Sequence, residues 1–383
     1  MQATVRSVEF APGSRVIVIS DIHGHPALLR RLLARVCYRA GIDYLILLGD
    51  LIEKGPDSLG VIREAMALTA ESDRVTVLMG NNDLWRLEQL TEPTPERDDV
   101  LFSTTHRFAR HWGSSLLLEM SRLLGLDCTV REELPAIREA VRDAFAEELD
   151  FLRSLPTVLV SQRHIFVHGG LPCPETKILS LEERNAFCCL KYDNFLGDLD
   201  ARRTAFSRWV VVGHWPVTLY RVAIPSHAPL IDPAHHVVSI DGGCGLKREG
   251  QLNAVTFDPA SDVFTSAHVD ALPLIRALDD QPASPDSINI HWGDNAVSLL
   301  ENAPLRPGYH AVEHLRTGRR LYIPEGDLYT DQGELFCQDC TDYQLPVAVG
   351  ETLSLVKTTP DAAIVKRGGV VGWYLGRYEA AEE

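Results

Sequence analysis

The sequence lacks two features that would place the protein in a membrane or on nucleic acid. No apolar run is long enough to span a bilayer without a charged interruption, and residues 1–10 lack the apolar core of a signal peptide. The chain has fewer basic than acidic residues, with 37 Lys and Arg and 53 Asp and Glu, which gives a formal net charge of −16. Binding by bulk attraction to phosphates is therefore disfavoured. We expect a cytoplasmic protein without a membrane or nucleic-acid partner, and the sequence leaves the oligomeric state open.

The eight cysteines also lack the context of a disulfide framework, because the chain is long and shows no secretory signal. Cys337 and Cys340 form an isolated CxxC pair. A zinc site normally needs a second pair or a histidine partner, and none follows at a familiar spacing. We expect reduced thiols there rather than a structural metal.

What is present is a chain of 383 residues with 45% hydrophobic content, which predicts a large globular domain and a smaller one. The first 80 residues alternate short β-branched runs with leucine-rich segments of helical spacing. The runs are residues 15–20, 44–48 and 74–79, and the helical segments are residues 26–38 and 57–68. Strands that alternate with helices through short connections predict a parallel α/β sheet.

The pattern changes twice further along the chain. Residues 84–155 have helical periodicity without a convincing strand, which predicts a helical insertion over one edge or mouth of the sheet. Later strands, of a mixed second sheet, are expected at residues 157–160, 164–167, 209–212, 237–240, 252–257 and 263–268. After the Pro/Ser-rich residues 281–286, short runs between turn residues predict a small all-β barrel. We therefore expect a main domain over residues 1–280 and a barrel-like domain over residues 287–383.

Residue types that bind metals follow successive predicted strands, at the point where each strand ends. They are Asp21, His23, Asp50, Asn81, His168 and His214. Open α/β sheets place their sites outside the carboxyl ends of the strands. A single histidine or Gly-Asp at such a place is ordinary, but six residues in the same position relative to successive strands predict a metal site. Alternation along an extended segment also puts Asp21 and His23 on the same side.

The motifs that carry these residues resemble those of the calcineurin-like metallophosphoesterases, and within them the phosphoprotein phosphatases and the bacterial diadenosine tetraphosphatases. The motifs are Asp21-x-His23, Gly49-Asp50, Gly80-Asn81, His168-Gly169-Gly170 and Gly213-His214. The later stretch Ile240–Gly245, followed by Leu252–Val255, is similar to the end of that catalytic domain. The resemblance covers about residues 13–270. It implies a two-sheet sandwich flanked by helices, with residues 1–280 as the catalytic domain.

The resemblance also implies two divalent metal ions and assigns their ligands. The expected ligands are Asp21 and His23 for the first ion, Asp50 for both ions, and Asn81, His168 and His214 for the second ion. A carboxylate has two oxygens that can hold cations a few ångströms apart, and ions roughly 3.5–4 Å apart suit in-line phosphoryl displacement. Imidazole, carboxylate and amide donors together favour Mn, Fe or Zn.

Two motifs depart from the family pattern. The family's Gly-Asp-x-x-Asp-Arg-Gly is here Gly49–Gly55, with Glu53 and Lys54 in the acidic and arginine places, and Asn82 stands where the family has a histidine. In the family that histidine, held by the acidic residue, protonates the leaving group or stabilises its charge. An amide donates a hydrogen bond but no proton at a useful pH. Asn82 and Glu53 are therefore candidate catalytic residues, with His25 as a substitute acid and Lys54 as the phosphate contact, and we expect leaving groups of low pKa.

Three functions remain open on this sequence. The first is a metal-dependent phosphatase, which uses a metal-bridging hydroxide to hydrolyse phosphoester substrates such as a serine/threonine phosphoprotein. The second is a dinucleoside polyphosphate hydrolase, which the bacterial relatives and the missing general acid favour. The third is a metal-containing binding or regulatory module with little turnover. In each case the expected partner is a phosphorylated protein or nucleotide.

Overall fold

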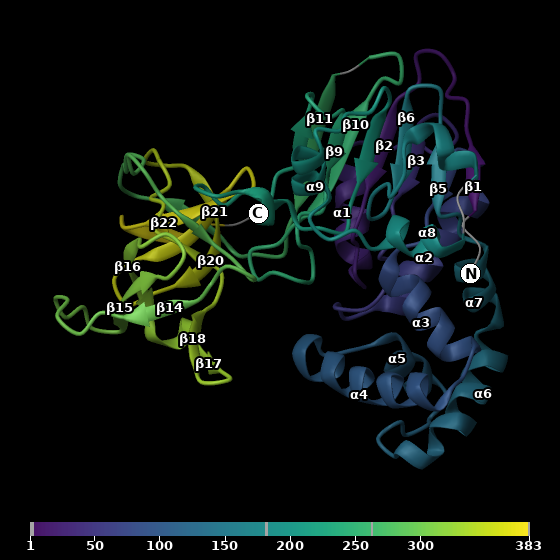
Figure 1. Ribbon diagram of the computed structural model, residues 1–383, viewed down its shortest axis with the longest axis horizontal. Coiled ribbons are helices and arrows are strands. Elements are labelled where there is room, and N and C mark those ends of the chain that lie inside the picture. The colour runs from purple at the N-terminus through teal and green to yellow at the C-terminus, as the bar shows by residue number, and fades with distance from the viewer. Residues whose placement is uncertain (1–3, 181–182, 262, 382–383) are drawn as a thin grey trace. The chain divides into compact units, whose positions relative to one another are not determined.

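The chain folds into two compact units in the computed structural model (Figure 1). The structure describes residues 4–180, 183–261 and 263–381. The first unit holds the residues up to Pro216 together with Pro229–Asp270. The second unit holds Val217–Ala228 together with the residues from Ala271 onward.

The boundary between the units lies after Asp270, before the predicted domain end at residue 280. Strand β12 (Leu274–Ala277) pairs with two strands of the second unit and therefore belongs to it. The segment Val217–Ala228 also joins the second unit, because the side chain of Asn289 donates to the carbonyl oxygens of Thr218 and Arg221. That the two units are separate domains stays a prediction.

Within the described residues, the first unit is a sandwich of two mixed β-sheets. One has the strand order β11 (Phe264–Val269), β10 (Leu252–Phe257), β2 (Val16–Ile19), β3 (Tyr44–Leu47) and β4 (Val75–Val77). The other has the order β1 (Val5–Ser7), β5 (Val158–Val160), β6 (His164–Val167), β7 (Trp209–Val212), β9 (Val237–Ser239) and β8 (Leu230–Asp232). Strands β2–β4 are parallel, as are β6, β7 and β9, so their carboxyl ends share an edge in each sheet. The predicted two-sheet sandwich is confirmed. The prediction that residues 252–257 and 263–268 belong to the second sheet is wrong, because β10 pairs with β2 and β11 pairs with β10 in the first sheet. The sequence did not predict the strands β1 and β8.

Alternate residues of the central strand β2 face opposite sides of its sheet. Val16 and Val18 lie in the core between the two sheets. Ile17 and Ile19 lie on the other face, in the core that the sheet shares with the helices. Each fully buried aliphatic side chain contributes about 1.5–3 kcal/mol. Burial on both faces fixes the register of the strand, and with it the place where the next residue leaves the sheet.

Helices α1 (Pro26–Arg35) and α2 (Ser58–Glu71) connect the parallel strands and pack on the outer face of the β2–β4 sheet. Both predicted helices are confirmed, although α1 ends at Arg35 rather than at residue 38. The Asp57 side chain accepts a hydrogen bond from the backbone N of Gly60 at 2.7 Å and caps α2, as an N-cap aspartate does.

Helices fill the region predicted as a helical insertion. They are α3 (Asn81–Thr91), α4 (Pro95–Trp112), α5 (Leu116–Leu123), η1 (Arg131–Glu133), α6 (Leu134–Ala144) and α7 (Ala146–Ser154). The first helix begins before the predicted residue 84, because the Asp83 side chain accepts from the backbone N of Gly80 at 2.9 Å and closes the first turn. Asn81 therefore stands at the start of a helix, and α5 and α7 pack against α2.

Three further helical segments, between β6 and β7, are η2 (Glu175–Ser180), α8 (Glu183–Leu190) and α9 (Phe195–Arg202). The sequence did not predict them, since each is short. The end of α8 contacts the loop after β6, where the carbonyl of Cys189 accepts from the backbone N of Gly169 at 2.7 Å. Over the part of the chain that is described, no helix has both the length and the apolar character needed to cross a membrane.

The second unit is rich in β-strands, as predicted. Its largest sheet has the order β22 (Val370–Tyr374), β21 (Ala363–Arg367), β20 (Thr352–Thr358), β12 and β23 (Tyr378–Ala380). One smaller sheet pairs β13 (Asn289–Ile290) with β19 (Cys340–Thr341), and another pairs β17 (Leu328–Asp331) with β18 (Glu334–Cys337). A third has the order β14 (Val297–Leu299), β15 (Tyr309–His314) and β16 (Arg320–Pro324). In the described residues these strands form several small sheets, which enclose separate apolar cores.

Candidate metal centre

Three predicted residues from three different strands meet at the carboxyl edge of the sandwich. Asp21 follows β2, Asp50 follows β3 and His168 follows β6, and all three are buried. One ligand atom from each lies within 4.8 Å of the others. Two carboxylates and an imidazole at this spacing could hold a metal ion.

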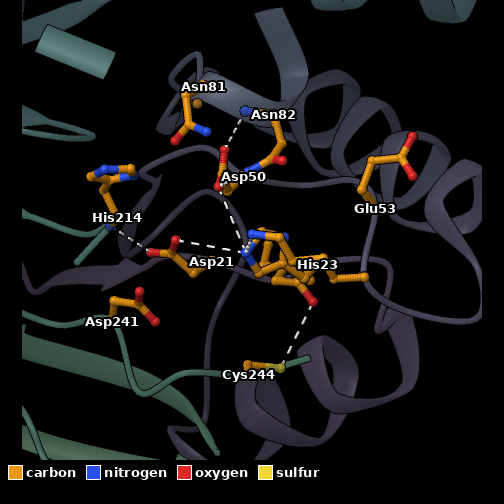
Figure 2. Close-up of polar contacts among 12 residues, drawn as sticks. Asp21, His23, Asp50, Glu53, Asn81, Asn82, His214, Asp241 and Cys244 are labelled. Carbon is orange, nitrogen blue, oxygen red and sulfur yellow. Dashed lines mark hydrogen bonds and ion pairs between the residues drawn. The ribbon is translucent and has the colours of Figure 1, made fainter. Parts of the chain in front are cut away.

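The other predicted ligands lie around this group. The Nε2 atom of His23 is 3.6 Å from Oδ2 of Asp50 and 4.0 Å from Oδ1 of Asp21. On the opposite side, Nε2 of His168 is 3.4 Å from Oδ1 of Asp50 and 3.1 Å from Oδ1 of Asn81. Figure 2 shows the side chains of Asp21, His23 and Asp50 turned toward one another. The two oxygens of Asp50 thus face different histidines, one on each side.

His214 lies beside the cluster. Its ring centroid is 5.4 Å from that of His168, and its backbone N donates to Oδ2 of Asp21 at 3.1 Å. Its Nε2 atom is 2.9 Å from Oδ1 of Asp193, a half-exposed carboxylate that the sequence did not single out. The six predicted residues thus lie in one region, but Nε2 of His214 contacts Asp193 rather than the carboxylates of Asp21 or Asp50. That the six are metal ligands stays a prediction.

Backbone geometry at the site is unusual for residues with a side chain. Asp21, His23, Asp50 and His214 have φ of 57°, 47°, 51° and 63°. This left-handed region is uncommon for non-glycine residues, and such strain persists only where surrounding contacts over-determine it. Here the backbone N of His23 donates to the carbonyl of Asp50 at 3.0 Å, which ties neighbouring strand ends together. The left-handed conformation is thus found at four of the six predicted ligands.

Backbone carbonyls orient two of the histidines. Nδ1 of His23 lies 3.1 Å from the carbonyl of Ile52, and Nδ1 of His168 lies 2.9 Å from the carbonyl of Leu48. A carbonyl oxygen only accepts, so each Nδ1 carries the hydrogen and donates it. Nε2 of each ring is the atom that faces Asp50. In the metal-free protein, burial lowers the pKa of His23 to about 3 and leaves a lone pair on its Nε2. Burial would lower the pKa of His168 too, but Asp50 and Asp21 outweigh burial there and raise the pKa to about 9, so its Nε2 carries a proton that a bound metal ion would displace. Nδ1 held by a carbonyl is the usual arrangement behind a histidine that binds metal.

Negative charge accumulates at the site in a dry environment. Burial raises the pKa of Asp21, and the nearby Asp50 adds to the rise. Burial together with the charge of Asp21 also raises the pKa of Asp241 well above its usual range. Burial would raise the pKa of Asp50 too, but His168 and His23 outweigh it and hold the pKa well below the usual value. Like charges crowded in this way are relieved by a bound cation.

Sequence reasoning missed the roles of Asp241 and Asp83. Asp241 follows β9, so the strand-end rule that found the other ligands could have found it as well. Asp83 accepts hydrogen bonds from the backbone N of Leu51 and of Gly80, both at 2.9 Å, and thereby joins the second and third motifs. Burial and the charge of Asp50 raise the pKa of Asp83 to about 7.

The predicted catalytic residues are only partly brought together. Asn82 donates from its backbone N to Oδ1 of Asp50 at 2.8 Å and from Nδ2 to Oδ2 at 2.5 Å. Glu53 is buried in contact with Arg86 instead, and in Figure 2 its side chain points away from Asp50. Glu53 therefore does not lie at the metal cluster, because Arg86 offers its carboxylate a charged partner in the insertion.

His25 and Lys54 flank His23. Nδ1 of His25 donates to the carbonyl of His23 at 2.6 Å, so the ring is held by the backbone, and burial lowers its pKa. Lys54 places Nζ 3.4 Å from Nε2 of His23. Of these two, Lys54 is the one whose charged end lies at the metal cluster.

The sandwich, with carboxylates and histidines gathered at its strand ends, defines the metallophosphoesterase class of fold. The sequence model described as "Calcineurin-like phosphoesterase" matches residues 14–232, which is more than half of the 383 residues. The chain therefore belongs to the calcineurin-like phosphoesterase family, and the resemblance seen in the motifs is confirmed.

Curated relatives are named symmetrical bis(5'-nucleosyl)-tetraphosphatases. One from Chromobacterium violaceum is 30% identical over 199 residues, which is 51% of this chain and 57% of the relative. One from Shewanella baltica is 29% identical over 188 residues, which is 48% of this chain and 55% of the relative. One from Buchnera aphidicola is 42% identical over 66 residues, which is 17% of this chain and 23% of the relative. The matches thus span little more than half of these relatives at most.

Solved structures with a similar chain course include a protein serine/threonine phosphatase of Saccharomyces cerevisiae, at 11% identity and a TM-score of 0.43 over 70% of this chain and 84% of that chain. A metallophosphoesterase of Sphaerobacter thermophilus has 15% identity and a TM-score of 0.37 over 67% of this chain and 88% of that chain.

Proposed function

We propose that the protein is a two-metal-dependent hydrolase of phosphate esters or anhydrides. The observation that carries the proposal is the position of Asp50, whose two oxygens face His23 on one side, at 3.6 Å, and His168 on the other, at 3.4 Å. A carboxylate between two sets of neutral or acidic donors suits a ligand shared by two cations. Asp21 and His23 would hold one ion, and Asn81, His168 and His214 the other. The donor set favours Mn, Fe or Zn.

Two divalent ions at this place would supply a water deprotonated near neutral pH and would offset the charge of the phosphate. The protein's own residues do the rest. His23 and His168 present Nε2 because backbone carbonyls hold Nδ1, and Lys54 extends an ammonium group to the same cluster. That ammonium would bind a phosphate oxygen of the substrate and keep the phosphorus in line.

A phosphoanhydride substrate is the second, narrower candidate. Asn82 donates to Asp50 and carries no acidic proton, so a leaving group that needs protonation would depart slowly. A dinucleoside polyphosphate has a leaving group of low pKa, and the names of the curated relatives point to this substrate class. Three statements remain predictions from the sequence. They are that the substrate is a phosphoprotein, that the protein is a metal-containing binding module with little turnover, and that it is cytoplasmic.

The test is turnover by protein stripped of metal and reloaded with Mn²⁺, on para-nitrophenyl phosphate, diadenosine tetraphosphate and a phosphopeptide. Turnover by the reloaded protein that Asp50→Asn abolishes would support the proposal, and the preferred substrate would choose between ester and anhydride. Asp43→Asn is the matched control, because Asp43 is a buried carboxylate at the other end of β3. Metal binding without any turnover would favour the binding module, and failure to bind metal would overturn the proposal.

A further inference from the structure

The loop after Asp50 holds two consecutive residues in a left-handed conformation. Glu53 and Lys54 have φ of 63° and 59°, which residues other than glycine seldom adopt. Such backbone persists only where the surroundings over-determine it. The contacts that hold this loop therefore decide where the Lys54 amine lies.

The helical insertion holds the Glu53 side chain. Oε1 of Glu53 accepts from Nε of Arg86 at 2.7 Å and from the backbone N of Leu116 at 3.3 Å. The side chains of Glu53 and Arg86 have no exposed surface. A buried ion pair carries a large desolvation cost and is weak support for stability by itself. The ion pair holds Glu53, the residue directly before Lys54, so it can fix the position of Lys54.

Arg86 is itself fixed within the insertion. Its Nη1 donates to Oε1 of Gln89 at 2.9 Å, and its guanidinium carbon lies 5.1 Å from the ring centroid of Trp85. Arg86 lies on α3, the helix that begins with Asn81. One rigid helix thus carries a proposed metal ligand at its start and the arginine that holds the loop in its second turn.

A carboxylate of the insertion holds the far end of the loop. Glu119 of α5 accepts from the backbone N of Ser58 at 3.0 Å and of Leu59 at 2.8 Å. On its other side the loop lies close to the chain around His23, since a Cβ added at Gly55 would lie 2.0 Å from the His23 carbonyl oxygen. The loop is therefore clamped between the insertion and the His23 segment.

We infer that Arg86 is a positioning residue, which acts through Glu53 to keep the Lys54 amine at the metal cluster, where it binds a phosphate oxygen. Lys54 places Nζ 3.4 Å from Nε2 of His23, while the carboxylate of the preceding residue is anchored in the insertion. The inference rests on the proposed function. It makes the helical insertion a part of the phosphate-binding site rather than a cover above it.

The experiment is a double-variant cycle on the full chain reloaded with Mn²⁺, read by calorimetric binding of inorganic phosphate and by steady-state kinetics. Arg86→Met removes the ion pair and keeps apolar bulk. We expect it to weaken phosphate binding and raise KM about tenfold with little change in kcat, since a hydrogen bond to a charged group is worth about that factor. Lys54→Met should cause the same loss. The double variant should lose no more than either one, because Arg86 acts through Lys54.

Arg138→Met is the matched control. Arg138 is another nearly buried arginine of the insertion, and it pairs with Asp98 of α4 rather than with the loop. This variant should lower Tm and leave phosphate affinity unchanged. Additive losses in the cycle, or an equal loss of affinity in Arg138→Met, would overturn the inference. Should Arg86→Met not fold, Arg86→Lys and Glu53→Gln keep a polar partner in place and are read in the same way.

Failure of the proposed function gives a different result, in which neither the wild type nor any variant binds phosphate or turns over. Amide hydrogen exchange of residues 51–58 in the metal-free protein then still decides the positioning role. Arg86→Met should speed exchange in this loop while Arg138→Met leaves it unchanged. Equal exchange in the wild type and Arg86→Met would show that the ion pair does not position the loop.

Discussion

The buried carboxylates at the two ends of the parallel strands have different charged neighbours. Asp43, just before β3, is fully buried and is matched by arginines, with Nη2 of Arg15 at 2.7 Å and Nη2 of Arg39 at 3.1 Å. Burial would raise its pKa, but the two guanidinium groups outweigh burial and lower the pKa to about 2. At this end the buried charge of Asp43 is compensated within the protein.

The carboxyl end of the same strand is built differently. Asp50 and Asp241 are buried there beside Asp21, and the neighbouring cationic groups are His168 and Lys54 rather than a pair of arginines. Burial and mutual repulsion raise the pKa of Asp21 and Asp241. At the amino end of β3, the ion pairs of the buried carboxylate stabilise the fold. At the carboxyl end, the buried carboxylates carry negative charge that a bound cation can neutralise.

The largest expected effect comes from breaking the carboxyl end. Asp50→Asn should lower kcat/KM by more than about 10³-fold, because charge stabilisation by bridged metals is worth several kcal/mol. Turnover by the Mn²⁺-loaded variant is the measurement. Asp43→Asn, at the compensated end, should keep turnover within a small factor. Equal losses in the two variants would mean that the two ends do not differ in function.

The next largest effect concerns Asn82, whose amide cannot donate a proton to the leaving group. Without a proton donor at this position, the rate should fall steeply as the leaving-group pKa rises, with aryl phosphates favoured over alkyl phosphates by about 10²-fold, the low end of general acid catalysis. The measurement is kcat/KM over a series of phosphate monoesters. Asn82→His should flatten the series. A flat dependence in the wild type would instead mean that another group, such as His25, donates the proton.

Substitution of Asp43, at the amino end of β3, should lower the stability of the protein. Asp43→Asn leaves Arg15 and Arg39 without a charged partner and should cost about 1–3 kcal/mol of unfolding free energy, less than a fully buried pair because both arginines are partly exposed. The folded pKa of about 2 lies below the unfolded value of about 3.9. The contribution is therefore present above pH 4 and is lost as the pH falls toward 2. Denaturant unfolding of both proteins across this range should converge at the acid end.

Much of this contrast could be predicted from the sequence, and the reason is periodicity. The apolar runs of β2, β3 and β6 fix where each strand ends, so Asp21, Asp50 and His168 could be placed at one edge without coordinates. The same rule applied to β9 would have added Asp241. Periodicity does not show which side chains that lie far apart in the sequence form ion pairs or hydrogen bonds with each other.

Glu53 illustrates what was missed. Its place in the motif predicted a catalytic role, but in the folded chain it pairs with Arg86 of α3, which lies in the insertion. This pairing depends on how α3, α4 and α5 pack, and amphipathic spacing does not specify that packing. The transfer of Val217–Ala228 to the second unit is likewise a long-range pairing that local sequence does not encode.

The smallest effect has the opposite sign from that of Asp43→Asn and therefore sharpens the comparison most. Asp241→Asn removes one of the repelling carboxylates at the carboxyl end, so the metal-free protein should gain stability, with Tm higher by roughly 1–3 °C. The exposed Asp73, in the turn before β4, provides the control Asp73→Asn, which should leave Tm unchanged. In saturating Mn²⁺ the variant should gain less than the wild type, because the ion stabilises the folded state in proportion to its affinity and Asp241 contributes to that affinity. Scanning calorimetry with and without metal measures both differences. A lower Tm for metal-free Asp241→Asn would mean that the charge at this end is compensated after all, and that the two ends of the sheet follow one rule.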